Sequence, residues 1–254
     1  MNTGVKLPSI PTWTSKHDLK TLQEKAVDEA TFNRGYRMMA VSPGELKFPS
    51  WQSCYARGVT LSDLRRRGLP EYVGVDLSSP RRPGNAIVRV GLEPQTNYRV
   101  LLGVRFGKWT SPQTARALAE ECEGANVQYI QVENNAYQDS LIDWIKSEKV
   151  NFPFWMKIEP FTTGTNKADP QFGLPGLEVE FHNKGWILPY EQWEGHPASC
   201  ACDWCHLDRE MRLYPRGATF DGGMALWFAR DALNKWAPRP GATGSGNLGR
   251  LNMR

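Results

Sequence analysis

The sequence predicts an α/β fold in which helices flank a mixed β-sheet. Three consecutive β-like runs lie between residues 72 and 107, and short turn-rich links join them, which is typical of an antiparallel meander. Two units follow in which a helical pattern precedes a strand pattern. The chain has 254 residues, is 40% hydrophobic and contains ten Trp, so it is long enough to bury a sizeable core.

Helical patterns precede the meander. The first is expected at residues 16–37, where Ser15 is a suitable cap and apolar residues recur with helical spacing. A second short helix is expected at residues 62–67. It contains three consecutive arginines, Arg65, Arg66 and Arg67, which indicate either a solvated helix end or contact with phosphates.

The two helix–strand units complete the expected sheet. Helices are predicted at 111–123 and 136–149, and strands at 127–133 and 152–161. Ser111 is a suitable cap, Pro112 fits a first turn, and Gly124 ends the first of these helices. The order βββ-αβ-αβ is the one that a ribonuclease H-like sheet of five strands requires.

A longer connection and two more helices follow. Residues 174–183 predict a helix, 186–188 a short strand, and 207–214 and 221–236 two further helices. We therefore expect an N-terminal helical extension or linker at 1–70 and a ribonuclease H-like α/β domain at 71–237. Residues 238–254 are rich in Pro, Gly and Ser and predict a disordered tail.

Three acids mark the candidate catalytic site. Asp76 interrupts an apolar strand, where a carboxylate is costly to bury unless something pairs with it. Glu133 ends a later strand and Asp221 opens the last helix, so the expected fold can bring all three to one point. Hard oxygen ligands select Mg²⁺ or Mn²⁺, and two such ions cut phosphodiester bonds. The alternatives are an edge-strand aspartate, a strand-end acid paired with arginine, and an ordinary helix N-cap.

Four polar residues are candidates for substrate binding. Asn134, Asn135 and Gln138 follow Glu133, where they either hydrogen-bond the acids or a phosphate, or cap the next helix. Lys167 lies in a loop rich in Gly, Thr and Asn. It is interpreted as a phosphate-positioning residue, with a solvated loop lysine as the competing interpretation.

A cysteine cluster predicts a structural zinc site. The segment H-P-A-S-C-A-C-D-W-C supplies one imidazole and three thiolates, which is a complete tetrahedral set. The ligands would be His196, Cys200, Cys202 and Cys205, and His206 is an alternative to His196. The competing interpretation is a reduced thiol cluster without metal. Cys54 and Cys122 stand apart and are expected to be small buried hydrophobes.

The composition limits the kinds of binding partner and the cellular location that we expect for this protein. The net charge of +4 permits a polyanionic partner without requiring one. No run of eighteen apolar residues occurs, and the first residues lack an apolar signal segment, so we expect a cytoplasmic protein without membrane contact. No helix is rich in the Arg, Asn and Gln that read a major groove, so sequence-specific binding is not expected.

Several motifs resemble those of the nuclease domain of large terminase subunits of tailed bacteriophages. These are V-G-V-D-L-S, I-Q-V-E-N-N-A-Y-Q, T-T-G-T-N-K-A-D-P with W-I-L-P after it, and R-L-Y-P-R-G-A-T-F-D-G-G-M-A-L-W-F-A. The likeness covers residues 72–236. It implies an endonuclease that cuts concatemeric double-stranded viral DNA in the host cytoplasm, with a motor ATPase, a small terminase subunit and a portal as partners.

The chain departs from that family in two ways. The family often has paired aspartates before the last helix, whereas here Phe220 precedes a single Asp221. The phosphate loop of the family's motor is missing, so this chain is expected to be an excised domain or a separate nuclease subunit. The alternative functions are a non-catalytic, zinc-stabilised DNA-binding or assembly module, and another ribonuclease H-like nuclease such as a resolvase or an exonuclease.

Overall fold

The computed structural model describes residues 46–77, 84–133, 138–147, 158–161 and 173–237. The strands are β1 (Tyr55–Ala56), β2 (Glu71–Asp76), β3 (Asn85–Leu92), β4 (Arg99–Gly107), β5 (Val127–Glu133), β6 (Ile158–Phe161) and β7 (Trp186–Pro189). The helices are α3 (Leu61–Arg66), α4 (Ser111–Cys122), α5 (Gln138–Ser147), α6 (Leu174–His182), α7 (Asp203–Leu213) and α8 (Asp221–Trp236), with short 3-10 helices η2 (Trp51–Cys54) and η5 (Tyr190–Gln192).

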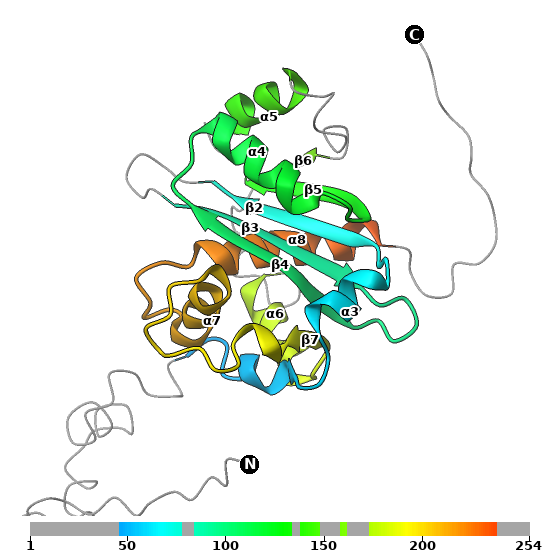
Figure 1. The fold of residues 1–254 in the computed structure, drawn as a ribbon, viewed down its shortest axis with the longest axis vertical. Helices are drawn as coiled ribbons and strands as arrows, with labels where there is room; N and C mark the ends of the chain where they lie inside the picture. Colours follow the sequence, from blue (N-terminus) through cyan, green and yellow to red (C-terminus); the bar gives the residue numbers. More distant parts are fainter. Residues whose placement is uncertain (1–45, 78–83, 134–137, 148–157, 162–172, 238–254) are drawn as a thin grey trace, which may run out of the picture.

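The strands form one sheet with helices on both faces. Its order is β1-β7-β4-β3-β2-β5-β6. Helices α4 and α5 lie on one face, and α6, α7 and α8 lie on the other (Figure 1). The structure therefore has the mixed α/β architecture that the sequence predicts.

The five predicted strands form the contiguous part of this sheet from β4 to β6. β3 is antiparallel to β2 and β4, while β5 runs parallel to β2 and β6 runs parallel to β5. The sheet has seven strands rather than five because β7 pairs with β4 and β1 pairs with β7. This pairing extends the sheet with residues from distant parts of the chain, which local patterns do not reveal.

Side chains alternate along the central strand β2, and this alternation orients the site. Val73 and Val75 pack in the core under α4 and α5, while Tyr72 packs in the core formed with α8. Gly74 lies on the α8 face, where an added Cβ would overlap the Ala225 carbonyl oxygen of that helix. Helix and strand therefore meet backbone to backbone, and Asp76, two residues further along, faces the same side.

Residues 46–70, which the sequence analysis assigns to the extension, pack against the sheet. Phe48 and Trp51 are buried in the α8-side core, and Trp51 packs edge-on against Phe181 of α6 with ring centroids 5.1 Å apart. This segment is therefore part of the same packed unit as the strands.

The arginine run makes contacts within the protein. The Arg65 guanidinium donates to the Leu102 carbonyl oxygen at 2.8 and 3.1 Å, and Arg66 pairs with Asp63. Arg67 pairs with Glu93 at 2.9 Å. These contacts favour the interpretation of a helix end over a phosphate-binding surface.

Element boundaries follow the sequence patterns with two differences. Thr110, not Ser111, is the residue before α4, and its backbone N–H donates to the Gln113 side chain at 2.9 Å. Helix α7 begins at Asp203, four residues before its expected start, and its first turn includes Cys205 of the cysteine cluster. The predicted helix at 16–37 and the predicted tail at 238–254 lie outside the described residues, as do residues 152–157 of the predicted fifth strand.

Cys54 and Cys122 are buried free thiols, as predicted. Burial raises the pKa of the Cys122 thiol to about 12, so it stays protonated.

In the part of the chain that the structure describes, no helix is both long and apolar enough to cross a membrane.

Substituting Gly74 by alanine tests the backbone contact between β2 and α8. The added methyl would displace α8, and overpacking of this kind costs about 1–3 kcal/mol. For a domain of this size, that corresponds to a fall in melting temperature of roughly 3–10 °C, which calorimetry or circular dichroism would measure.

Gly185→Ala is the matched control, because a Cβ at that position would approach the Glu180 carbonyl oxygen only to 3.3 Å. We expect a smaller loss for this variant. If both variants melted at the same temperature as the unaltered protein, the tight α8 contact would be refuted.

Candidate functional site

Two of the predicted acids end neighbouring parallel strands. β2 ends at Asp76 and β5 ends at Glu133, and the register pairs Val75 with Val132 just before them. Parallel strands present their carboxyl ends at the same edge of a sheet. Gln131 on β5 donates to Asp231 of α8 at 2.9 Å, so Glu133, two residues later, faces the same helix as Asp76.

The third acid reaches this edge from α8. Asp221 is the first residue of that helix, and its Oδ2 atom would lie 2.9 Å from a Cβ built on Gly84. Gly84 directly precedes β3, in which Ala86 pairs with Asp76. The structure therefore brings Asp76, Glu133 and Asp221 to one corner of the sheet.

Negative charge accumulates at this corner. Asp76 is 8% exposed, and burial raises its pKa well above the usual value. The charge of Glu133 and a hydrogen bond with it raise that pKa further, and the charges of Asp221 and Glu210 add to the effect. Carboxylate oxygens are the ligands that Mg²⁺ and Mn²⁺ prefer, so the donor set fits a hard divalent cation.

A fourth acid, Glu210 of α7, holds the start of α8. Its side chain accepts the backbone N–H groups of Asp221 at 3.2 Å, Gly222 at 2.7 Å and Gly223 at 3.3 Å. The Thr219 hydroxyl also donates to it, at 2.6 Å. Asp221 is therefore not the N-cap that its position in the sequence suggests, because the Glu210 side chain binds the first N–H groups of α8 instead. No local pattern identifies Glu210, because it lies 11 residues before Asp221 on another helix.

The structure also accounts for Phe220, which stands where the resembled family often has an acid. Its ring stacks on Tyr214 with centroids 3.9 Å apart and on Phe48 at 5.7 Å. Gly223 is needed beneath it, because a Cβ there would overlap the Phe220 ring. Phe220 therefore anchors the segment before α8 in an aromatic cluster rather than adding charge to the corner.

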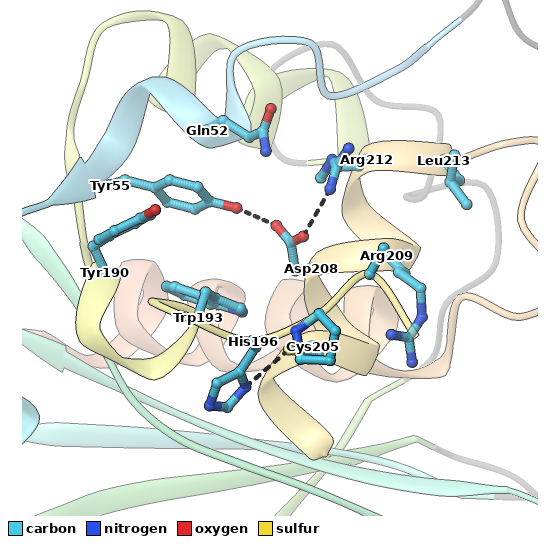
Figure 2. Close-up of a pocket in the computed structure, with 12 residues that line it drawn as sticks. Gln52, Tyr55, Tyr190, Trp193, His196, Cys205, Asp208, Arg209, Arg212 and Leu213 are labelled. Atoms are coloured by element: carbon cyan, nitrogen blue, oxygen red, sulfur yellow. Dashed lines mark hydrogen bonds and ion pairs between the residues drawn. The ribbon is translucent and has the colours of Figure 1, made fainter. Parts of the chain in front are cut away.

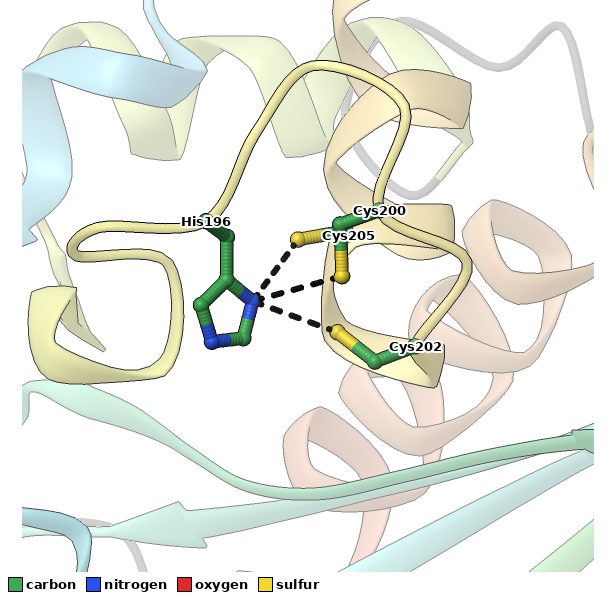
Figure 3. A group of neighbouring side chains, drawn as sticks. All are labelled: His196, Cys200, Cys202 and Cys205. Atoms are coloured by element: carbon green, nitrogen blue, oxygen red, sulfur yellow. Dashed lines mark hydrogen bonds between the residues drawn. The ribbon is translucent and has the colours of Figure 1, made fainter.

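The predicted zinc ligands form a second group (Figure 3). His196 Nδ1 lies 3.3 Å from the sulfur of Cys205 and 3.5 Å from the sulfurs of Cys200 and Cys202. The four ligand atoms all lie within 4.8 Å of one another, and the three cysteines are free. Tetrahedral zinc with ordinary bond lengths separates its N and S ligands by about 3.6 Å. The group therefore fits one tetrahedral metal ion.

His206, the alternative fourth ligand, does not belong to this group. Its ring stacks on Phe106 with centroids 4.1 Å apart, and its Nε2 lies 3.4 Å from the Thr219 hydroxyl. It therefore faces the start of α8, because one further residue along α7 turns its side chain away from that of Cys205.

Among the predicted substrate-binding residues, Asn134, Asn135 and Lys167 lie outside the described residues. Gln138 is the first residue of α5, and its side chain also lies outside what is described.

A pocket of about 350 Å³ lies beside α7, and His196 and Cys205 of the cysteine cluster are among the residues that line it (Figure 2). Asp208 lines it and accepts hydrogen bonds from the Trp51 indole at 2.9 Å and from the Tyr55 hydroxyl. The Arg212 guanidinium also pairs with the Asp208 carboxylate, with Nη1 and Oδ2 3.3 Å apart. The Asp208 carboxylate is thus occupied in joining residues 51–55 to α7.

The chain matches no family model and no curated protein. The solved structures to which it is similar include the following three. One is the large terminase nuclease of the thermophilic phage G20c with bound magnesium, at 14% identity over 63% of this chain and 80% of that one, TM-score 0.43. Another is the human cytomegalovirus terminase nuclease domain, manganese-soaked and inhibitor-bound, at 14% identity over 65% and 83%, TM-score 0.47. The third is the HK97 bacteriophage large terminase, at 13% identity over 68% and 43%, TM-score 0.47.

Proposed function

We propose that the protein is a metal-dependent DNA endonuclease of the viral genome-packaging type, which cuts concatemeric double-stranded DNA. The observation that carries this proposal is the convergence of Asp76, Glu133 and Asp221 at the carboxyl edge of the sheet. Burial and the neighbouring carboxylates raise the pKa of Asp76, and bound cations would offset this repulsion between like charges.

Two divalent cations, Mg²⁺ or Mn²⁺, are the proposed cofactors, and such ions activate a water nucleophile and stabilise the leaving oxygen when bound. Asp76, Glu133 and Asp221 would hold them. Asp76 and Glu133 are mounted on strands, which limits their movement, and Asp221 is held by the first turn of α8. The proposed substrate-binding residues are Lys167, which would position a phosphate, and Asn134, Asn135 and Gln138, which would hydrogen-bond the acids or a phosphate.

The terminase assignment rests on the motifs around these acids. V-G-V-D-L-S contains Asp76, I-Q-V-E-N-N contains Glu133, and T-F-D-G-G-M-A-L-W-F-A contains Asp221. A protein of this type would act in the host cytoplasm with a motor ATPase, a small terminase subunit and a portal. It would hold DNA through backbone phosphates, so its binding would weaken with salt.

The second proposed cofactor is a structural zinc ion held by His196, Cys200, Cys202 and Cys205. Four protein ligands leave no open position for substrate, so the ion would stabilise the fold rather than act in catalysis. Because Cys202 directly precedes α7 and Cys205 lies in its first turn, the ion would fasten the start of that helix.

Plasmid nicking in Mn²⁺ tests the acid site. Asp76→Asn removes a charged metal ligand while keeping the side-chain shape, and we expect at least a 100-fold loss of cleavage rate. Asp143→Asn is the matched control, since Asp143 is exposed on α5 on the opposite face of the sheet, and it should cleave at the unaltered rate.

Cleavage that survives Asp76→Asn would show that the acid site is wrongly assigned. DNA binding without cleavage in any divalent cation would instead favour the non-catalytic module. Faster cutting of branched than of linear DNA would favour a resolvase.

Metal analysis and melting test the zinc site. We expect one zinc per chain, and removal by a strong chelator should lower the melting temperature by more than about 5 °C because metal binding stabilises the folded state. Cys202→Ser should lose the zinc, whereas Ser199→Ala in the same loop should keep it. Purified protein without zinc, whose melting is unaffected by the chelator, would refute the site.

A further inference from the structure

Helix α7 links the cysteine cluster to the acidic corner. Its first turn carries Cys205 of the proposed zinc group, and five residues later Glu210 contacts the start of α8. Glu210 is 3% exposed, and Leu207 and Met211 of the same helix are fully buried in the α8-side core. The position of Glu210 is therefore determined by packing and not by solvent-exposed contacts.

The Glu210 carboxylate is saturated by its neighbours. Oε1 accepts from the Thr219 hydroxyl and the Asp221 N–H, and Oε2 accepts from the N–H groups of Gly222 and Gly223. A carboxylate offers about four acceptor positions, so these four donors use all of them. Coordination of a cation by Glu210 would require one of these bonds to break, and the side chain therefore acts through α8.

Small residues make this approach possible. A Cβ on Gly222 would lie 2.9 Å from Glu210 Oε2 and would overlap the Phe106 ring. The helix start also attracts a carboxylate, because unpaired N–H groups and the helix dipole concentrate positive charge there. Glu210 thus replaces the side-chain cap that Phe220 does not provide.

We propose that Glu210 is a positioning residue that holds Asp221 against the corner containing Asp76 and Glu133, so that the three acids bind divalent cations together. This inference rests on the proposed nuclease function. The cysteine cluster would hold the start of α7 in place. Glu210, further along the same helix, then contacts the start of α8 and so determines the position of Asp221.

Glu210→Gln tests the proposal in the full chain loaded with zinc. The glutamine keeps the size of the side chain but points an NH₂ group at backbone donors, so the first turn of α8 should open. We expect faster amide hydrogen exchange at residues 221–224, and about tenfold weaker Mn²⁺ binding by calorimetry or by the Mn²⁺ electron paramagnetic resonance signal.

Two control variants distinguish the positioning of Asp221 from the general effects of losing a negative charge or losing stability. Glu194→Gln removes the same charge from an exposed residue near the cysteine cluster, and its Mn²⁺ affinity should match the unaltered protein. Ile145→Val lowers stability from the buried face of α5 and should leave both the exchange at 221–224 and the Mn²⁺ affinity unchanged. If Glu210→Gln does not fold, Thr219→Val removes one of the four donors and should give a smaller change in the same direction.

Unchanged exchange at residues 221–224 in a folded Glu210→Gln protein would overturn the proposal, as would unchanged Mn²⁺ affinity where the unaltered protein binds Mn²⁺. Failure of the proposed nuclease function is distinguishable, because the unaltered protein would then bind no Mn²⁺. Exchange at 221–224 would still report whether Glu210 holds Asp221.

Discussion

The backbone contact between α8 and β2 at Gly74 is the constraint on which the site depends. A helix normally rests on a sheet through side chains, whereas here the Ala225 carbonyl lies where a Cβ of residue 74 would be. This close approach determines the height of α8 above the sheet. It also brings the first residue of the helix, Asp221, to the edge where β2 ends at Asp76.

Charge pairing distinguishes the acidic corner from two other acids of the described chain, the buried Glu71 and the half-buried Glu180. Glu71 pairs with Arg89 at 2.6 Å, and Glu180 pairs with Arg230 at 2.7 Å. In both pairs an arginine offsets the cost of burying a carboxylate. Around Asp76, by contrast, Glu133 and further carboxylates raise the pKa. An arrangement that concentrates like charges is costly for folding, and it is useful where cations bind.

Much of the fold could be predicted because its elements have strong local patterns. The bounds of β5 and α8 agree with the expected 127–133 and 221–236. The β-branched apolar run of β5 and the run of residues 224–236 without Gly or Pro are both local features of the sequence. The cysteine cluster was equally visible, because its four ligands lie within ten residues. A short strand was expected at 186–188, where β7 lies, whereas β1 was not expected. The pairing of β1 with β7 was not visible in the sequence either, because it joins residues more than 100 positions apart.

The order of the elements and the kinds of ligand atoms that the chain offers could be predicted from residue patterns alone, because periodicity and residue chemistry are local properties. Three features depend instead on how the folded chain packs: Glu210 holds the start of α8, Phe220 lies in an aromatic cluster, and His196 rather than His206 joins the cysteines. Each of these choices depends on how α7 packs against its neighbours. This packing depends on the shape and burial of side chains that are far apart in the sequence, so the local spacing of residues does not predict it.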